Sequence, residues 1–118
     1  MAHDDAFDHD ILILGGGLVG SALACALDGL GWRVGQVEAS APAAGAPGFD
    51  ERKLALAAAS LTALASLDVL PRLATAPAPI RRVHVSRAGD FGSVRLDAAD
   101  FGQEAFGGVV LARELGDA

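Results

Sequence analysis

Glycines at a regular spacing are the residues of this sequence most suited to binding a ligand. Gly15, Gly17 and Gly20 fit the pattern G-x-G-x-x-G, with Leu18 and Val19 between the last two. The first glycine permits a tight turn, the second lets a phosphate approach the backbone, and the third lets a helix pack closely on a strand. The free N–H groups and positive dipole end of that helix favour anions. This spacing predicts a site for the pyrophosphate of a dinucleotide.

An acidic residue follows at the distance that such a site needs. Glu38 lies 18 positions after Gly20. A carboxylate there accepts hydrogen bonds from a ribose and repels a 2′-phosphate. The glycine motif together with Glu38 therefore favours the adenosine half of FAD or NAD over NADP. The fingerprint itself does not choose between FAD and NAD; its place near the N-terminus favours FAD by analogy with many flavoproteins. A structural turn with an unrelated surface glutamate is the alternative reading.

The residues around the motif have the pattern of a strand, a helix and a second strand. Residues 11–14 are four apolar residues that predict a strand buried on both faces. Residues 18–30 have small and apolar side chains at helical spacing, and residues 33–38 read as the second strand. The two strands should be parallel, with a right-handed crossover. We therefore predict an α/β fold that begins with a Rossmann-like βαβ unit.

The rest of the chain predicts a change of architecture. Residues 39–50 form a loop rich in Ala, Gly and Pro, residues 53–70 have helical composition, and Pro71 starts a short turn. Residues 80–86 and 93–97 alternate like an antiparallel hairpin with Val94 and Leu96 inward, and residues 106–112 read as another strand.

The expected organisation has three parts. It is a flexible acidic leader (1–9), an FAD-binding βαβ unit with following helices (10–79), and the first antiparallel strands of a substrate domain (80–118). These strands are too few to close a second core, so the fold is expected to be incomplete.

Composition excludes several classes of function. The chain has 118 residues, a net charge of −6 and 20% charged residues, which is a globular composition without the basic footprint that nucleic acid requires. The lone Cys25 predicts no internal disulfide, and the three histidines lack metal-ligand spacing, so no metal site is expected. No apolar stretch is long enough to span a membrane, and the acidic leader does not resemble a secretory signal.

The sequence resembles the FAD-dependent aromatic hydroxylases, the class A flavoprotein monooxygenases. Within them it is most similar to the ubiquinone-biosynthesis hydroxylases of 2-polyprenyl-6-methoxyphenol. The matching segments are residues 11–20 with Glu38, PGFDER at 47–52 running into LALA at 54–57, VHVS at 83–86 followed by Gly89, and GVV at 108–110. The fingerprint is common to many flavoproteins, whereas Asp50-x-Arg52-x-x-Ala55-Leu56 is more specific.

The resemblance implies roles for two arginines and for several small molecules. Arg52 would approach the flavin cofactor, and Arg113 lies where the family chain returns to the flavin site; an arginine at a helix start is otherwise usually a solvated surface residue. Such enzymes reduce bound FAD with NAD(P)H or another reductant and use O₂ to hydroxylate an electron-rich phenol. The expected substrate is a polyprenylated phenol. No catalytic acid–base residue in this chain is needed for that chemistry.

The sequence also departs from the family. The family's two later flavin-gripping segments, one with Asp-Gly and one with Gly-Asp or Gly-Asn, are not recognised in these 118 residues. The 118 residues alone are therefore expected to bind FAD weakly or not at all and to hydroxylate nothing. Exposed strand edges favour association with a second copy. A lipidic substrate favours a cytoplasmic protein peripheral to the inner membrane.

Two alternatives remain open. One is another FAD- or NAD-dependent oxidoreductase, which the segment around Arg52 disfavours. The other is a non-catalytic dinucleotide-binding fragment, which a longer reading frame carrying the two flavin segments would exclude.

Overall fold

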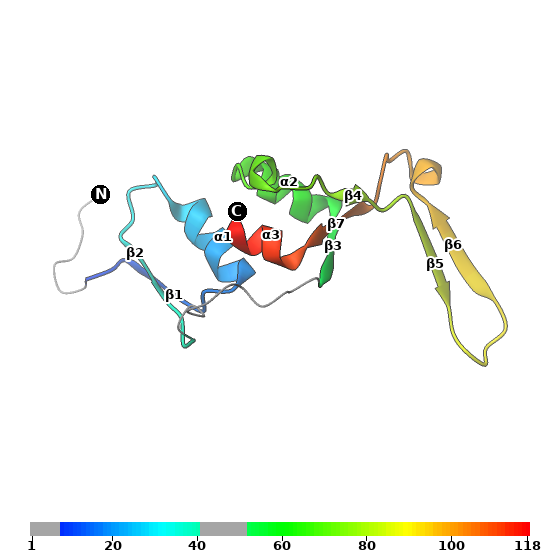
Figure 1. Cartoon of the computed structure of the whole chain (residues 1–118), viewed down its shortest axis with the longest axis horizontal. Helices are drawn as coiled ribbons and strands as arrows, with labels where there is room; N and C mark the ends of the chain where they lie inside the picture. Colours follow the sequence, from blue (N-terminus) through cyan, green and yellow to red (C-terminus); the bar gives the residue numbers. More distant parts are fainter. Residues whose placement is uncertain (1–7, 41–51) are drawn as a thin grey trace. The chain divides into compact units, whose positions relative to one another are not determined.

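The chain forms two compact units, Met1–Phe49 and Asp50–Ala118 (Figure 1). The computed structural model describes residues 8–40 and 52–118. Its strands and helices make a mixed α/β structure. Residues 1–7 of the expected leader (1–9) and most of the expected loop at 39–50 lie outside the described residues. Within the described ranges, no helix has the length and apolar content needed to cross a bilayer.

The first unit is a strand, a helix and a second strand. β1 (Ile11–Leu14), α1 (Leu18–Leu27) and β2 (Val34–Val37) follow one another along the chain. β1 and β2 pair in parallel, which confirms the predicted β-α-β order. The helix is shorter than the expected span of 18–30. Gly29 and Gly31 adopt φ values of +71° and +81°, so the backbone already turns toward β2 there.

An ion pair joins the starts of the two parallel strands. The Asp10 carboxylate accepts hydrogen bonds from the Arg33 backbone N–H at 2.8 Å and from its Nη2 at 3.1 Å. The Asp10 N–H donates in return to the Arg33 carbonyl at 2.8 Å. The side-chain hydrogen bond to Asp10 raises the pKa of Arg33. These bonds fix which residues of β1 and β2 lie opposite each other.

Only one face of the two-stranded sheet carries a buried side chain. Ile13 is 7% exposed, whereas Leu12 and Leu14 are 57% and 78% exposed. Ile13 lies opposite Gln36, and Gln36 is the strand residue nearest to the helix at Gly20. The prediction of a strand buried on both faces is therefore wrong for the described residues, because α1 supplies a layer on one side only.

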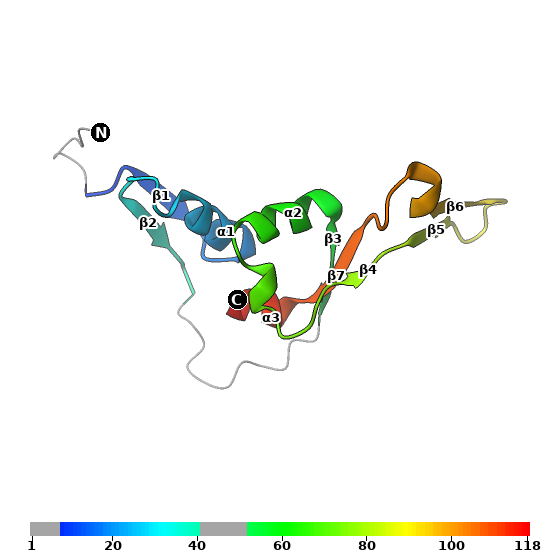
Figure 2. The same cartoon turned by 90° about the horizontal axis from the view of Figure 1, so that it is seen from above.

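The second unit is built on a three-stranded antiparallel sheet in the order β3-β7-β4 (Figure 2). Its strands are β3 (Lys53–Ala57), β4 (Ala78–Pro79) and β7 (Gly107–Leu111). The helices are α2 (Ala58–Ser66), α3 (Ala112–Asp117) and the short η1 (Leu70–Arg72), which forms at Pro71 as predicted. Because β3 pairs with β7, this sheet joins residues from both sides of the expected boundary at 79/80.

The prediction of helical structure from residue 53 onward is wrong for the first five residues. These residues, KLALA, form β3, and the helix proper begins at Ala58. Every residue of β3 pairs with one of β7, and its side chains alternate between exposed and half-buried. The alternation of Leu with Lys or Ala has a period of two, so pairing with a strand 50 to 58 residues later decides the conformation.

β5 (Arg82–Ser86) and β6 (Ser93–Asp97) form the predicted antiparallel hairpin, followed by η2 (Ala98–Phe101). The prediction that Val94 and Leu96 point inward is wrong: they are 55% and 36% exposed, and their neighbour Val85 is 57% exposed. Among the described residues the hairpin contacts mainly its own strands and η2. No further layer of described residues therefore covers the face of the hairpin that carries Val85, Val94 and Leu96.

Candidate functional site

The glycine turn, residues 15–17, connects β1 to α1 in the first unit. Gly15 has a φ of +107°, a conformation that side-chain-bearing residues rarely adopt. Its N–H donates to the Val37 carbonyl at 2.7 Å, so the turn begins where the two parallel strands end. The motif therefore lies at the carboxyl edge of the strands, where open α/β sheets place their ligands.

Gly20 is required by the packing of the helix on the turn. A Cβ at this position would lie 2.1 Å from the Gly15 carbonyl oxygen and 3.2 Å from Gln36 Nε2. No carbon atom can approach a backbone oxygen that closely. The need for glycine at position 20 thus comes from the protein's own structure.

Gly17 differs from Gly20 because nothing in the structure demands a glycine there. A Cβ at Gly17 would meet no atom of the described residues within 4 Å, and its φ of −73° is open to any residue. Gly17 is the N-cap of α1, with no capping side chain and no acidic residue in the first turn. Leu18 and Val19, the first helical residues, are 40% and 84% exposed. The first residues of the helix are therefore exposed, and no described residue lies beside the Cβ position of Gly17.

Glu38 lies against the glycine turn, as its spacing from the motif requires. Its Oε2 accepts a hydrogen bond from the Gly16 N–H at 2.5 Å, and its Oε1 accepts one from the Ser40 N–H at 2.9 Å. Backbone hydrogen bonds from Ser40, Gly16 and Ala39 lower the pKa of Glu38. An ionised carboxylate is thereby fixed beside the turn, where it can accept from hydroxyl groups and repels a second anion.

Two further side chains contact the turn and were not singled out from the sequence. Gln36 Nε2 donates to the Gly15 carbonyl at 3.1 Å, and Ser21 Oγ donates to the Gly16 carbonyl at 3.2 Å. The available signal was Gln36 itself, a polar residue between Gly35 and Val37 in a strand. Ser21, in the first turn of a helix, carried no signal.

Arg52 and Arg113 belong to the second unit. The Arg52 carbonyl accepts a hydrogen bond from the Ala112 N–H at 2.9 Å, and Arg113 is the next residue, in the first turn of α3. Their backbones therefore meet at one end of the β3–β7 ladder, although they are 61 positions apart in the sequence. The structure thus brings together the backbones at Arg52 and Arg113, and it separately places Glu38 against the glycine turn.

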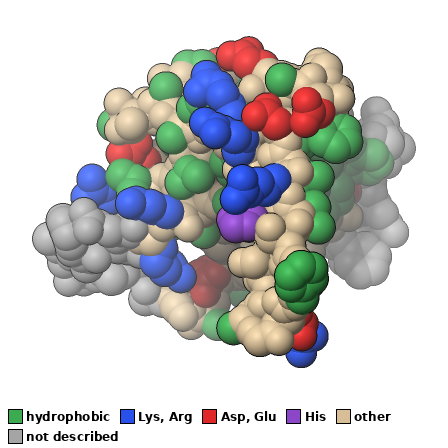
Figure 3. Space-filling view, turned by 90° about the vertical axis from the view of Figure 1, so that its right-hand side faces the viewer, with side chains coloured by type: hydrophobic (Ala, Val, Ile, Leu, Met, Phe, Trp, Pro, Cys, Tyr) green, Lys and Arg blue, Asp and Glu red, His purple; other side chains and the backbone are tan. Residues whose placement is uncertain are grey.

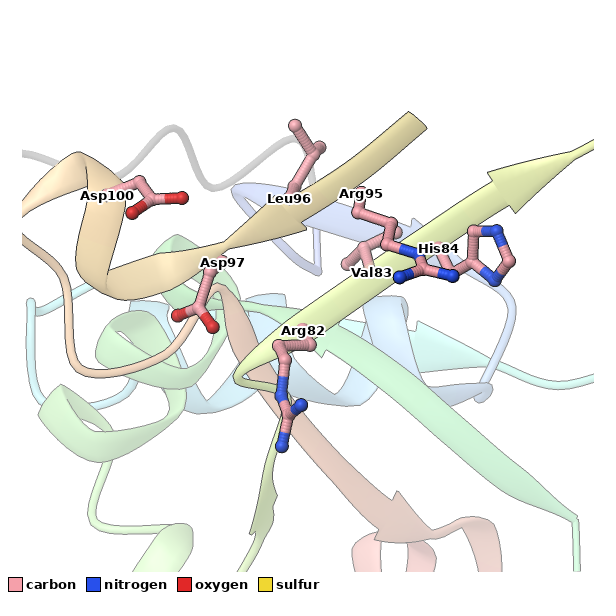
Figure 4. Close-up of a pocket in the computed structure, with 7 residues that line it drawn as sticks. All are labelled: Arg82, Val83, His84, Arg95, Leu96, Asp97 and Asp100. Atoms are coloured by element: carbon pink, nitrogen blue, oxygen red, sulfur yellow. The ribbon is translucent and has the colours of Figure 1, made fainter. Parts of the chain in front are cut away.

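A shallow hollow of about 470 Å³ lies on the β5–β6 hairpin (Figure 4). It is lined by Arg82, Val83, His84, Arg95, Leu96, Asp97 and Asp100. Two arginines and two aspartates balance each other, and basic and acidic side chains are intermixed on this face of the molecule (Figure 3). In the described part of the chain, no three His, Cys, Asp or Glu residues gather as metal ligands. The hollow thus offers no dominant charge to select a ligand.

A scan of the sequence against models of known protein families finds no match.

Proposed function

We propose that the first unit binds the adenosine and pyrophosphate of FAD, as a Rossmann-like βαβ unit. The observation that carries the proposal is the contrast between two glycines of one motif. Gly20 is glycine because the helix packs on it, whereas no described residue occupies the space where a side chain at Gly17 would project. A glycine that the fold does not require is explained by a ligand that approaches the backbone at that point.

The residues of the turn fit such a ligand. Gly15 makes the turn, and the amides of Gly17, Leu18 and Val19 would hold the pyrophosphate at the helix start. Glu38 would accept hydrogen bonds from the ribose and disfavour the 2′-phosphate of NADP. Arg52 and Arg113 are proposed to approach the cofactor on the strength of the family resemblance, as fixed cations facing an anionic group.

The same resemblance supports a wider proposal. The chain is the FAD-binding N-terminal part of a monooxygenase that hydroxylates a polyprenylated phenol in ubiquinone biosynthesis. The flavin would supply the redox chemistry, with NAD(P)H as electron donor and O₂ as co-substrate. The residues present here would bind and orient the cofactor and contribute no catalytic acid or base. A cytoplasmic location peripheral to the inner membrane, and self-association through strand edges, belong to this proposal.

A nucleotide titration tests the proposed binding site. ADP carries the adenosine and diphosphate of FAD, so it should shift the backbone amide resonances of Gly17, Leu18 and Val19 in a saturable manner. Adenosine, which lacks the diphosphate, should bind at least about tenfold more weakly, because the helix start recognises the anion. Equal binding of ADP and adenosine would contradict a phosphate site at the glycine turn.

The ribose contact has its own test. Adenosine 2′,5′-diphosphate, which is AMP with an added 2′-phosphate, should bind more weakly than AMP to the wild type, and Glu38→Ala should reduce that difference by removing the repelling carboxylate. Flavin absorbance and NAD(P)H oxidation with candidate phenols test the wider proposal. For these 118 residues alone the expected result is weak flavin binding and no turnover, and clear turnover would contradict it.

A further inference from the structure

The first two peptide groups of the glycine turn are held by side chains from outside it. The Gly15–Gly16 peptide is held at both ends: Gln36 Nε2 donates to its carbonyl at 3.1 Å, and its N–H donates to Glu38 Oε2 at 2.5 Å. Gln36 and Glu38 are two residues apart, so the end of β2 holds this peptide from both sides.

The next peptide is held from the helix. Ser21 Oγ donates to the Gly16 carbonyl at 3.2 Å. The structure has no cis peptide bond among its described residues, and in a trans peptide the N–H points opposite to the carbonyl. The Gly17 N–H therefore points away from Ser21, and no described residue lies within 4 Å of the position of a Cβ on Gly17. The hydroxyl of Ser21 sets the direction of an amide that it does not touch.

A turn of three glycines would otherwise have many accessible conformations. Glycine loses more conformational freedom on ordering than any other residue, and a ligand that must order its site loses affinity accordingly. Amides that already point at the ligand cost no reorganisation when it binds. Side chains that fix two successive peptides thus reduce the entropy that binding must overcome.

We propose that Gln36 and Ser21 are positioning residues that pre-orient the amides of the glycine turn toward the phosphates of the ligand. The inference rests on the proposed function, since it concerns the same site. It assigns affinity to two residues that lie outside the G-x-G-x-x-G pattern and act through the backbone. It also gives the strand residue Gln36 a role that an apolar residue at this position could not fill.

Variants that differ in hydrogen-bond chemistry test the inference, with ADP titrated into the 118-residue chain. Gln36→Met keeps the length and loses the donor, and Ser21→Ala loses the hydroxyl. Each should weaken ADP binding about fivefold, which corresponds to one hydrogen bond of typical net strength. Gln36→Glu, which sets an acceptor against the Gly15 carbonyl, should weaken binding more than Gln36→Met. Ser21→Thr, which keeps a hydroxyl, should bind ADP within about twofold of wild type.

A matched control and a ligand-free measurement separate positioning from general loss of structure. Ser66 makes the same kind of bond in α2, from its Oγ to the Ala63 carbonyl at 2.7 Å, so Ser66→Ala should leave ADP binding unchanged. Without ligand, Gln36→Met should speed hydrogen exchange of the Gly16 amide. If wild type binds ADP and both Gln36→Met and Ser21→Ala bind it equally well, this inference fails and the proposed function stands. If wild type does not bind ADP, both fail.

Discussion

Adding a methyl group at Gly20 should destabilise the first unit strongly. The Cβ would lie 2.1 Å from the Gly15 carbonyl oxygen, whereas real Cβ contacts essentially never fall below 3.0 Å. The helix or the turn must therefore move by at least about 0.9 Å, the difference between these two distances. The opposing atom belongs to the backbone and is held by Gln36, so it cannot swing aside as a flexible side chain would.

The size of the effect follows from two opposing contributions. Overpacking of this severity costs on the order of 3 kcal/mol. Replacing glycine by alanine inside a helix raises the unfolding free energy by about 1 kcal/mol through helix propensity. The variant Gly20→Ala should thus lose about 2 kcal/mol of unfolding free energy, and its melting temperature should fall by roughly 8 °C or more.

The single tryptophan gives an assay that reports on the correct unit. Trp32 lies between α1 and β2, so urea unfolding followed by its fluorescence measures the first unit. Gly17→Ala is the control: its Cβ meets no atom of the described residues within 4 Å, and its unfolding free energy should stay within about 0.5 kcal/mol of wild type. Equal stability of Gly20→Ala and wild type would refute this reasoning, as would equal losses in the two variants.

Three further perturbations test other parts of the fold. Backbone hydrogen bonds lower the pKa of Glu38 below its ordinary value of 4.5, so its contribution to stability is complete above that pH and is lost as the pH falls through the lowered pKa. Glu38→Gln should therefore flatten the acid limb of the urea midpoint against pH, and an unchanged limb would contradict it. Asp10→Asn should lower the midpoint seen by tryptophan fluorescence, because Arg33 loses its anionic partner, and the loss should shrink at high salt. Gly107→Ala would bring a Cβ within 2.0 Å of the Leu56 carbonyl oxygen and should cost about 1–3 kcal/mol by far-ultraviolet circular dichroism. Gly116→Ala, which meets open space, is its control and should not destabilise the chain.

Local signals predicted the first unit well. A short apolar run, three glycines and a stretch of helical spacing are close together in the sequence, and each depends on neighbouring residues. The parallel pairing of β1 and β2 follows from their order around the helix. What the sequence could not show was how many layers cover the strands. An apolar run predicts burial on both faces, yet Leu12 and Leu14 are exposed here.

Nonlocal pairing explains the main error in the second unit. The segment KLALA has residues that suit a helix as well as a strand. Pairing with β7, 50 to 58 residues later in the sequence, decides for the strand. In the hairpin, alternation correctly predicted strands and their pairing. The same alternation could not show what covers Val94 and Leu96, because that depends on elements beyond the two strands.

The candidate site also contains residues that the sequence could predict and residues that it could not. The motif glycines and Glu38 follow a spacing rule, and the structure places Glu38 against the turn. Gln36 and Ser21 follow no such rule, since their contacts depend on how α1 and the end of β2 approach the turn. Arg52 and Arg113 were predicted from the family resemblance alone. The structure adds that their backbones meet at one end of the β3–β7 ladder.

The affinity of Gly17→Ala for ADP tests the central claim most directly, because this substitution should leave the fold intact and fill the space in front of the helix start. Wild type should show saturable shifts of the amides around the glycine turn. Gly17→Ala, at matched stability, should bind ADP about tenfold more weakly or worse, since its methyl group would occupy the place of the phosphate. Equal binding by the two proteins, or no ADP binding by wild type, would contradict the account.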